Sequence, residues 1–230
     1  MRTSRKSLFA AVALVLTLAG SVFAQKPEKK ALVVGSPNYC ATFTKLLKKD
    51  FQCTALDRKN GAKAWKDQGY TLPKYEELKQ YALVVICPLA NTTAENKEDI
   101  VQFVKEGGSI YYGYSSLEWT FQKTKELGYG ICGFDKLSAQ FLKPYPKSGN
   151  MTHPLVYTRE MGKERSLTKK WLYSVYAGDL VDAVPLVENP ELKGLAVACV
   201  AKYGKGQFIF FGGEDHSIFM DIMKKCGLCK

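Results

Sequence analysis

The chain has 230 residues, of which 46% are hydrophobic and 24% charged, and its formal net charge is +11 at pH 7. Such a length is enough for one domain with a substantial core. The lysines are scattered along the sequence, whereas nucleic-acid binding requires basic residues clustered in a stripe with aromatic side chains. The charge therefore indicates a solvated basic surface, with attraction to anionic cell-envelope polymers as the alternative.

The first 24 residues have the pattern of a secretory signal peptide. A basic start is followed by an apolar run from Leu8 to about Leu18, and then by the small-residue segment 20–24. The apolar run is too short to remain as a membrane span. We therefore expect cleavage after Ala24 and a mature chain of 206 residues (230 − 24), whose charge is +8 because three basic residues leave with the signal. The expected product is a secreted or periplasmic protein that is not integral to the membrane.

From residue 29 to residue 115, strand and helix patterns alternate. The predicted strands are 29–36, 51–57, 81–89 and 109–115, all rich in apolar and β-branched residues. The predicted helices are 39–50 and 93–108, and the polar stretch 58–80 is predicted to be a loop with short helical pieces. This alternation predicts an α/β fold, with a three-layer, mostly parallel sheet covered by helices on both faces.

The second half is less regular. Residues 117–134 are predicted to form a helix that runs into a glycine-rich turn, and residues 144–154 a loop. Two strands around Tyr203-Gly204-Lys205-Gly206 are predicted to form a hairpin, and Ser217–Lys225 a final amphipathic helix. No linker or repeat interrupts the chain, so we expect a single domain over residues 25–230.

Seven cysteines leave at least one thiol free or paired with another chain. Cys87 and Cys199 stand in apolar strand patterns, where cysteine behaves as a small hydrophobic residue. Cys226 and Cys229 are spaced like a thiol-redox motif, but such motifs work at the start of a helix, and this pair follows one. A structural disulfide or a plain tail is therefore favoured over a redox centre.

Four segments in this order resemble the class I glutamine amidotransferase-like superfamily: the strand 81–89, the helix ending in Gly107-Gly108, the strand 109–116, and the late "THP … YGKGQFIFFGGEDH". Within it the chain is most similar to ThuA-like (trehalose utilisation) proteins and to the trimerisation domains of some β-galactosidases. The resemblance spans roughly Ala31 to His216 and implies a flavodoxin-like fold and a link to carbohydrate metabolism.

Catalytic members of this superfamily carry a glycine-x-cysteine-x-glycine turn after the strand that follows the two glycines. In this chain Tyr114 falls on the cysteine position and Tyr112 on the preceding glycine, and the histidine frequent in ThuA-like proteins is absent as well. A phenol with a pKa near 10 is a poor nucleophile. The resemblance therefore implies a degenerate elbow, meaning the turn at residues 113–116, without the family's cysteine chemistry and without a cofactor.

Other residues could replace the missing nucleophile. The candidates are Ser115 or Glu214, with His153 or His216 as the general base. A ligand could contact Tyr114, Ser115, Ser116, His153 and His216. The alternatives are that His153 shapes a loop before Pro154, and that Asp215 or Ser217 caps the last helix. The acids at 214 and 215 and both histidines have suitable ligand types for a metal, but no spacing motif supports one.

Aromatic side chains near the elbow are expected to fill the space between sheet and helices. Tyr114 is the exception, because its position in a turn indicates exposure. The sequence as a whole favours an exported, non-catalytic module for ligand binding or assembly. Its partner would be a small molecule, a carbohydrate or a second copy of the chain. The alternatives are a hydrolase, and a thiol-redox protein using Cys226 and Cys229.

Overall fold

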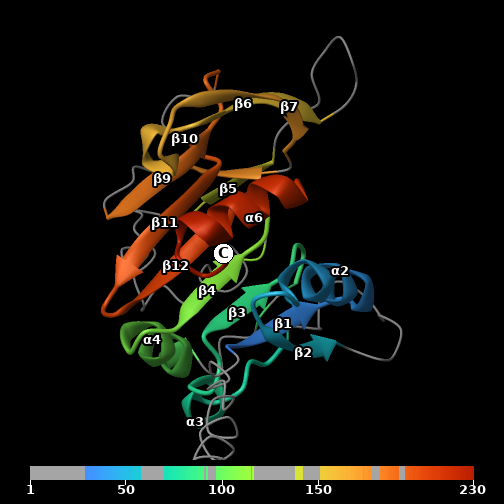
Figure 1. Cartoon of the computed structure of the whole chain (residues 1–230), viewed down its shortest axis with the longest axis vertical. Coiled ribbons are helices and arrows are strands. Elements are labelled where there is room, and N and C mark those ends of the chain that lie inside the picture. Colours follow the sequence, from blue (N-terminus) through green and yellow to red (C-terminus); the bar gives the residue numbers. More distant parts are fainter. Residues whose placement is uncertain are drawn as a thin grey trace, which may run out of the picture.

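The computed structural model describes residues 29–57, 70–90, 92, 97–114, 116, 138–141, 151–172, 174–177, 182–191 and 195–230. Over these residues the chain forms an α/β protein with a nine-stranded sheet in the order β2-β1-β3-β4-β12-β11-β9-β6-β7 (Figure 1). A separate three-stranded sheet has the order β10-β8-β5. None of the helices in these ranges is long and apolar enough to cross a bilayer.

The first half of the large sheet is parallel. It contains β1 (Lys30–Gly35), β2 (Gln52–Asp57), β3 (Leu83–Ile86) and β4 (Ser109–Tyr112), and the late strand β12 (Gly206–Phe211) joins it beside β4. The helices between these strands are α2 (Pro37–Leu47), α3 (Tyr75–Leu78) and α4 (Lys97–Lys105). All four strands and both long helices predicted for this region are present. The α/β prediction is therefore confirmed.

The second half of the large sheet is antiparallel. It contains β6 (Thr152–Tyr157), β7 (Arg165–Trp171), β9 (Ala183–Glu188) and β11 (Ala198–Tyr203), with the 3-10 turn η3 (Arg159–Met161) between β6 and β7. The small sheet contains β5 (Ser138–Phe141), β8 (Ser174–Ala177) and β10 (Leu195–Ala196), and α6 (His216–Lys225) closes the described chain. The sheet is therefore mixed, whereas the sequence pattern indicated mainly parallel strands.

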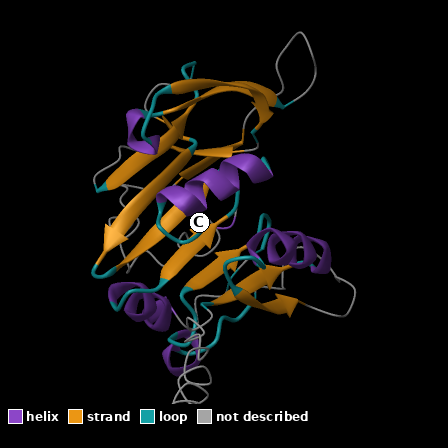
Figure 2. Ribbon diagram, viewed as in Figure 1, coloured by secondary structure: helices purple, strands orange, loops and turns teal. Residues whose placement is uncertain are grey.

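The core lies along the middle strands. Every residue of β3 and β4 is buried, in agreement with the apolar sequence of these two strands. Tyr111 of β4 packs edge-on against Phe219 of α6, with ring centroids 4.9 Å apart, and both rings contact Phe43 of α2. Figure 2 shows α6 in front of the sheet. These contacts fix the position of α6 relative to the end of β4.

The hairpin between β11 and β12 is confirmed, with Gly204 and Lys205 at its turn. Gly204 has a φ of +59°, which favours glycine. The final helix is also confirmed and begins at His216, directly after the cap residue Asp215. Cys87 and Cys199 are buried in the core as predicted.

The expectation of a loop around His153 and Pro154 is wrong, because both residues belong to β6. Alternate residues of this strand are buried, with His153, Leu155 and Tyr157 facing inward. Proline cannot donate to a strand ladder, and the register of β6 with β7 shifts between His153 and Leu155, around Pro154. A local irregularity therefore accommodates a residue that reads as a strand breaker.

Three predictions fall on residues outside the described ranges: the signal peptide 1–24, the helix 117–134 and the candidate nucleophile Ser115. They stay predictions.

Candidate functional site

The described residues of the elbow, 113, 114 and 116, follow β4 and lie beside the end of β3. Gly113 donates its N–H to the carbonyl of Ile86 at 2.9 Å, and Leu89 donates its N–H to the carbonyl of Tyr114 at 3.2 Å. A Cβ atom at position 113 would lie 2.6 Å from the backbone nitrogen of Pro88, so only glycine fits there. The chain therefore leaves β4 at the carboxyl end of the parallel strands, where ligands bind in open α/β sheets.

Tyr114 is buried at the centre of a polar cluster. Its hydroxyl donates to Oε1 of Glu214 at 2.7 Å and lies 2.9 Å from the hydroxyl of Tyr39, which also donates to Glu214. Its ring lies 5.7 Å from the ring of Trp171. Tyr114 is only 3% exposed, so the expectation of an exposed side chain is wrong. The hydroxyl can be buried because Glu214 accepts the hydrogen bond that water would otherwise accept.

Both tyrosines of this cluster are held in the neutral form. Burial, together with hydrogen bonds to Tyr39 and Glu214, raises the pKa of the Tyr114 hydroxyl far above its usual value near 10. Burial and the neighbouring Glu214 raise the pKa of Tyr39 to about 12. A phenolate nucleophile is therefore strongly disfavoured at neutral pH.

His216 is the first residue of α6 and lies edge-on to Phe43, with ring centroids 6.2 Å apart. It lines a cavity together with Tyr39, Tyr111 and Glu214. The volume of this cavity is about 10 Å³, which is close to the minimum that holds one water molecule. The structure thus brings Glu214 and His216 to one cavity, but that cavity has no room for a substrate.

Asp215 caps α6 as the sequence suggested. Its Oδ1 accepts the N–H groups of Ser217 and Ile218 at 3.0 Å, and its Oδ2 lies 2.7 Å from Nζ of Lys170. Burial alone would raise the pKa of this carboxyl, but Lys170 and the capping donors outweigh it and lower the pKa to about 2. Across the described ranges, no three His, Cys, Asp or Glu side chains lie close enough together to hold a metal ion.

His153 lies in a different environment from the elbow. It is 7% exposed on β6, and its charged neighbours are Glu191 and Lys169. Burial lowers the pKa of its imidazole. Ser116, another predicted ligand contact, is fully buried and donates its hydroxyl to the carbonyl of Cys87 at 2.8 Å. Neither side chain lines the cavity beside Glu214.

Sequence reasoning missed Tyr39, Lys170 and Trp171. Tyr39 could have been found, because it follows the first parallel strand and the carboxyl ends of neighbouring parallel strands meet at one edge of a sheet. Trp171 and Lys170 could not, because β7 reaches the elbow only through the antiparallel half of the sheet. An isolated bridge between Leu172 and Gly213 brings the end of β7 beside the segment that carries Glu214.

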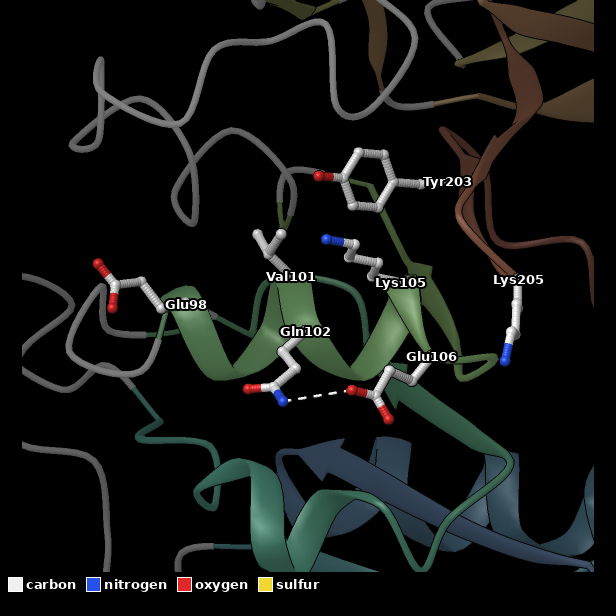
Figure 3. Close-up of a pocket in the computed structure, with 7 residues that line it drawn as sticks. All are labelled: Glu98, Val101, Gln102, Lys105, Glu106, Tyr203 and Lys205. Atoms are coloured by element: carbon white, nitrogen blue, oxygen red, sulfur yellow. Dashed lines mark hydrogen bonds between the residues drawn. The ribbon is translucent and has the colours of Figure 1, made fainter.

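A much larger cavity lies at the opposite end of the parallel strands. Figure 3 shows it between α4 and the β11–β12 hairpin, and its volume is about 600 Å³. Its charged side chains are balanced, two acidic and two basic, and Gln102 donates to Glu106 at its rim. Because α4 precedes β4 and the hairpin turn precedes β12, this groove adjoins the amino ends of the strands and not the elbow.

The cysteines at the C-terminus do not have the setting of a redox motif. Cys226 is the C-cap of α6, at the end of a helix where the dipole disfavours a thiolate. Burial is the main cause that raises the pKa of Cys226 to about 11 and that of Cys229 to about 12. All six cysteines in the described part of the chain are free thiols.

No protein-family model and no curated protein matches the chain. Solved structures do. A β-galactosidase from a Rahnella species has a TM-score of 0.58 at 14% identity, and the match covers 88% of this chain and 32% of that one. A protein from Bacteroides uniformis described as ThuA-like has a TM-score of 0.54 at 14% identity, and the match covers 90% of this chain and 93% of that one. A cytoplasmic protein of Salmonella typhimurium has a TM-score of 0.57 at 12% identity, and the match covers 87% of this chain and 100% of that one.

At these identities the comparisons show a shared fold and nothing finer. The fold is one that ThuA-like proteins and part of the β-galactosidases also have, in agreement with the resemblance seen in the sequence. The chain spans about a third of the length of the β-galactosidase.

Proposed function

We propose that the chain is a non-catalytic, amidotransferase-like module that self-associates and serves carbohydrate metabolism. The observation that carries the proposal is the closed elbow. The position of the family nucleophile holds a tyrosine whose hydroxyl is hydrogen-bonded to Glu214, and the adjoining cavity measures about 10 Å³. An assembly role needs a surface and not an open active site.

For the hydrolase alternative, Ser115 lies outside the described residues, and the positions of Ser116 and the two histidines give it little support. A serine nucleophile needs a base within hydrogen-bond reach. The hydroxyl of Ser116 is engaged with a backbone carbonyl, and His153 has Glu191 and Lys169 as its charged neighbours. The ring of His216 lies against Phe43. These positions favour structural roles for all three residues.

The link to carbohydrates and to assembly comes from the similar proteins. This chain matches about a third of a β-galactosidase and nearly all of a ThuA-like protein. A fold unit that makes up a third of one longer enzyme and nearly all of another protein suits an assembly role. Fold similarity alone carries little functional information, so this part of the proposal rests on analogy.

The proposal also includes the finer fold and the location. The parallel order β2-β1-β3-β4-β12, with α2 and α6 packed together on Tyr111, supports the flavodoxin-like, three-layer arrangement. The charged start and apolar run before Ala24 support export and cleavage of the first 24 residues.

Sedimentation velocity of the purified protein tests the assembly role. We expect an oligomer whose mass is a multiple of that of one protomer and which persists in the micromolar range. Binding to immobilised galactosides and glucosides is measured in parallel. A protein that remains monomeric at all concentrations, and that retains no saccharide, would overturn the proposal.

A further inference from the structure

A third cavity lies between α6 and the turn that joins β6 to β7. Its volume is about 390 Å³, within the range of small-molecule sites. Its polar lining comes from the end of β6, the turn after η3, the start of β7 and the second half of α6: Tyr157, Lys163, Arg165, Asp221, Lys224 and Lys225. None of these residues lines the cavity at the elbow.

The lining carries an excess of positive charge. Four cations face one carboxylate, which gives a net charge of +3. The carboxylate of Asp221 accepts the hydroxyl of Tyr157 at 2.6 Å. The ion pairs found in the described part of the chain involve other residues, so none of the four cations is neutralised by a direct partner there.

One exposed cation of the lining, Arg165, contacts a buried ring before any ligand binds. The guanidinium carbon of Arg165 lies 5.1 Å from the centre of the Tyr157 ring. That ring is itself fixed, because Tyr157 is 6% exposed and its hydroxyl is bound to Asp221. A cation–π contact uses the face of the guanidinium and leaves the N–H groups at its edge available to an acceptor.

The turn that presents Lys163 is also ordered. The Thr158 hydroxyl donates to the carbonyl of Pro185 at 2.7 Å, and Gly162 donates its N–H to the carbonyl of Arg159 at 2.9 Å. Gly162 has a φ of +101°, a conformation that favours glycine. The cations of the turn and of α6 are therefore presented on fixed backbone.

Simpler roles explain part of this arrangement. Lys224 and Lys225 complement the negative end of the α6 dipole, and a basic residue on β7 protects an edge strand from pairing with other chains. Neither role requires an arginine stacked on a buried tyrosine inside a cavity of unpaired positive charge. Fixed N–H donors surrounded by further cations are the arrangement that recognises carboxylate, sulfate and phosphate groups.

We propose that this cavity binds an oxyanion, a sulfate, phosphate or carboxylate group of a ligand, with Arg165 as the principal contact. The Tyr157 ring is covered by Arg165 and buried, so it offers no surface on which a nucleic-acid base could stack. The oxyanion would belong to a small molecule or to an acidic polysaccharide, and the test distinguishes the two. This site is independent of the elbow and of the assembly role.

Isothermal titration of the full protein at low ionic strength tests the site. The probes are inorganic phosphate, inorganic sulfate, glucose 6-phosphate and a sulfated oligosaccharide, and a neutral oligosaccharide serves as the blank. We expect saturable binding of the anions that weakens as salt is added. If the small anions and the sulfated oligosaccharide bind with equal affinity, a small oxyanion is sufficient as the ligand. If the oligosaccharide binds much more tightly, the ligand is an acidic polymer. Both results support the proposal.

Three variants show whether the binding belongs to this cavity. Arg165→Gln removes the charge and should weaken binding about tenfold, the loss expected for one charge-assisted hydrogen bond. Asp221→Asn keeps an acceptor for Tyr157, removes the repelling charge and should tighten binding. Lys49→Gln removes an exposed positive charge outside the cavity and should change affinity by less than about twofold. An absence of anion binding by the unmodified protein, or equal affinities of Arg165→Gln and Lys49→Gln, would overturn the proposal.

Discussion

Three oxygen atoms at the elbow share two phenolic protons. The hydroxyls of Tyr39 and Tyr114 contact each other, and both contact the same oxygen of Glu214. Both hydroxyls donate to Glu214, so neither proton is directed at a ligand. The cluster joins α2, the turn after β4 and the segment before α6. It therefore stabilises the arrangement of three elements that are far apart in the sequence.

The contribution of this cluster to stability can be measured with Tyr114→Phe. The variant keeps the ring beside Trp171 and loses the hydroxyl bound to Glu214. We expect the free energy of unfolding to fall by about 1–2 kcal/mol, because a hydrogen bond to a charged group is lost while Tyr39 still donates to Glu214. Urea denaturation measures the change.

Tyr81→Phe is the matched control. Tyr81 is half-buried, and its hydroxyl has no hydrogen bond in the described part of the chain. Its replacement should cost less than about 0.5 kcal/mol, as for a change away from any specific interaction. Equal losses in the two variants would contradict a stabilising role for the elbow cluster.

Asp215 should make the free energy of unfolding depend on pH in the acid range. Its pKa is about 2 in the folded protein and about 3.9 in an unfolded chain, so its carboxylate stabilises the fold above pH ~4. After a discount for solvent screening of this partly exposed group, the contribution is about 1–2 kcal/mol. It is lost as the pH falls from about 4 to about 2, the interval between the unfolded and the folded pKa.

The variant Asp215→Asn tests this assignment, because it retains a helix cap but removes the charge. Its unfolding free energy should vary less than that of the unmodified protein between about pH 5 and about pH 2.5. Urea denaturation across this range provides both profiles. Parallel pH profiles for the two proteins would refute the role of Asp215.

At the scale of elements, the β11–β12 hairpin packs its backbone directly against the end of α4. A Cβ atom at Gly206 would lie 2.1 Å from the carbonyl oxygen of Gly108 and 2.2 Å from that of Val104. These are backbone atoms, so neither neighbour can move aside without displacing α4 or β4. The glycine is therefore required by close approach and not by its dihedral angles.

Gly206→Ala should consequently lower the free energy of unfolding by about 1–3 kcal/mol, the usual cost of overpacking. Thermal and chemical denaturation measure this loss. Thr42→Ala is the control, because it places a better helix former at a half-buried position of α2 and should cost little. A loss in Gly206→Ala no greater than that in Thr42→Ala would contradict the close packing.

Sequence patterns predict well the elements whose structure is determined by their own local sequence. The apolar runs of β1 and β3, and the periodic faces of α2 and α6, are set by local composition, and all four elements were predicted. β6 was not predicted, because Pro154 reads as a loop residue and is accommodated only by the register shift against β7. Its formation depends on partners that are distant in the sequence.

The same distinction applies to the site at the scale of the whole molecule. Counting from Gly107-Gly108 to Tyr114 places the elbow after β4, because a strand has a fixed length per residue. The contact of Tyr114 with Glu214 spans 100 positions of sequence, and that with Trp171 depends on the antiparallel half of the sheet. Tertiary contacts of this kind leave no local pattern, so the burial of Tyr114 could not be predicted.

Export is a prediction about the whole chain. A basic start, an apolar run and a small-residue site occur in order before Gln25. Mass spectrometry of the protein isolated from the cell envelope or the medium should therefore find Gln25 at the N-terminus. A protein that retains Met1 and stays in the cytoplasm would contradict export.

A hydrolysis assay tests the closed elbow most directly. The purified protein is incubated with nitrophenyl galactosides, nitrophenyl esters and glutamine, and the release of nitrophenol or ammonia is followed alongside Tyr114→Phe and Ser115→Ala. The closed elbow predicts no turnover above the buffer rate for any of the three proteins. Turnover by the unmodified protein that disappears in either variant, while the variant remains folded, would contradict it.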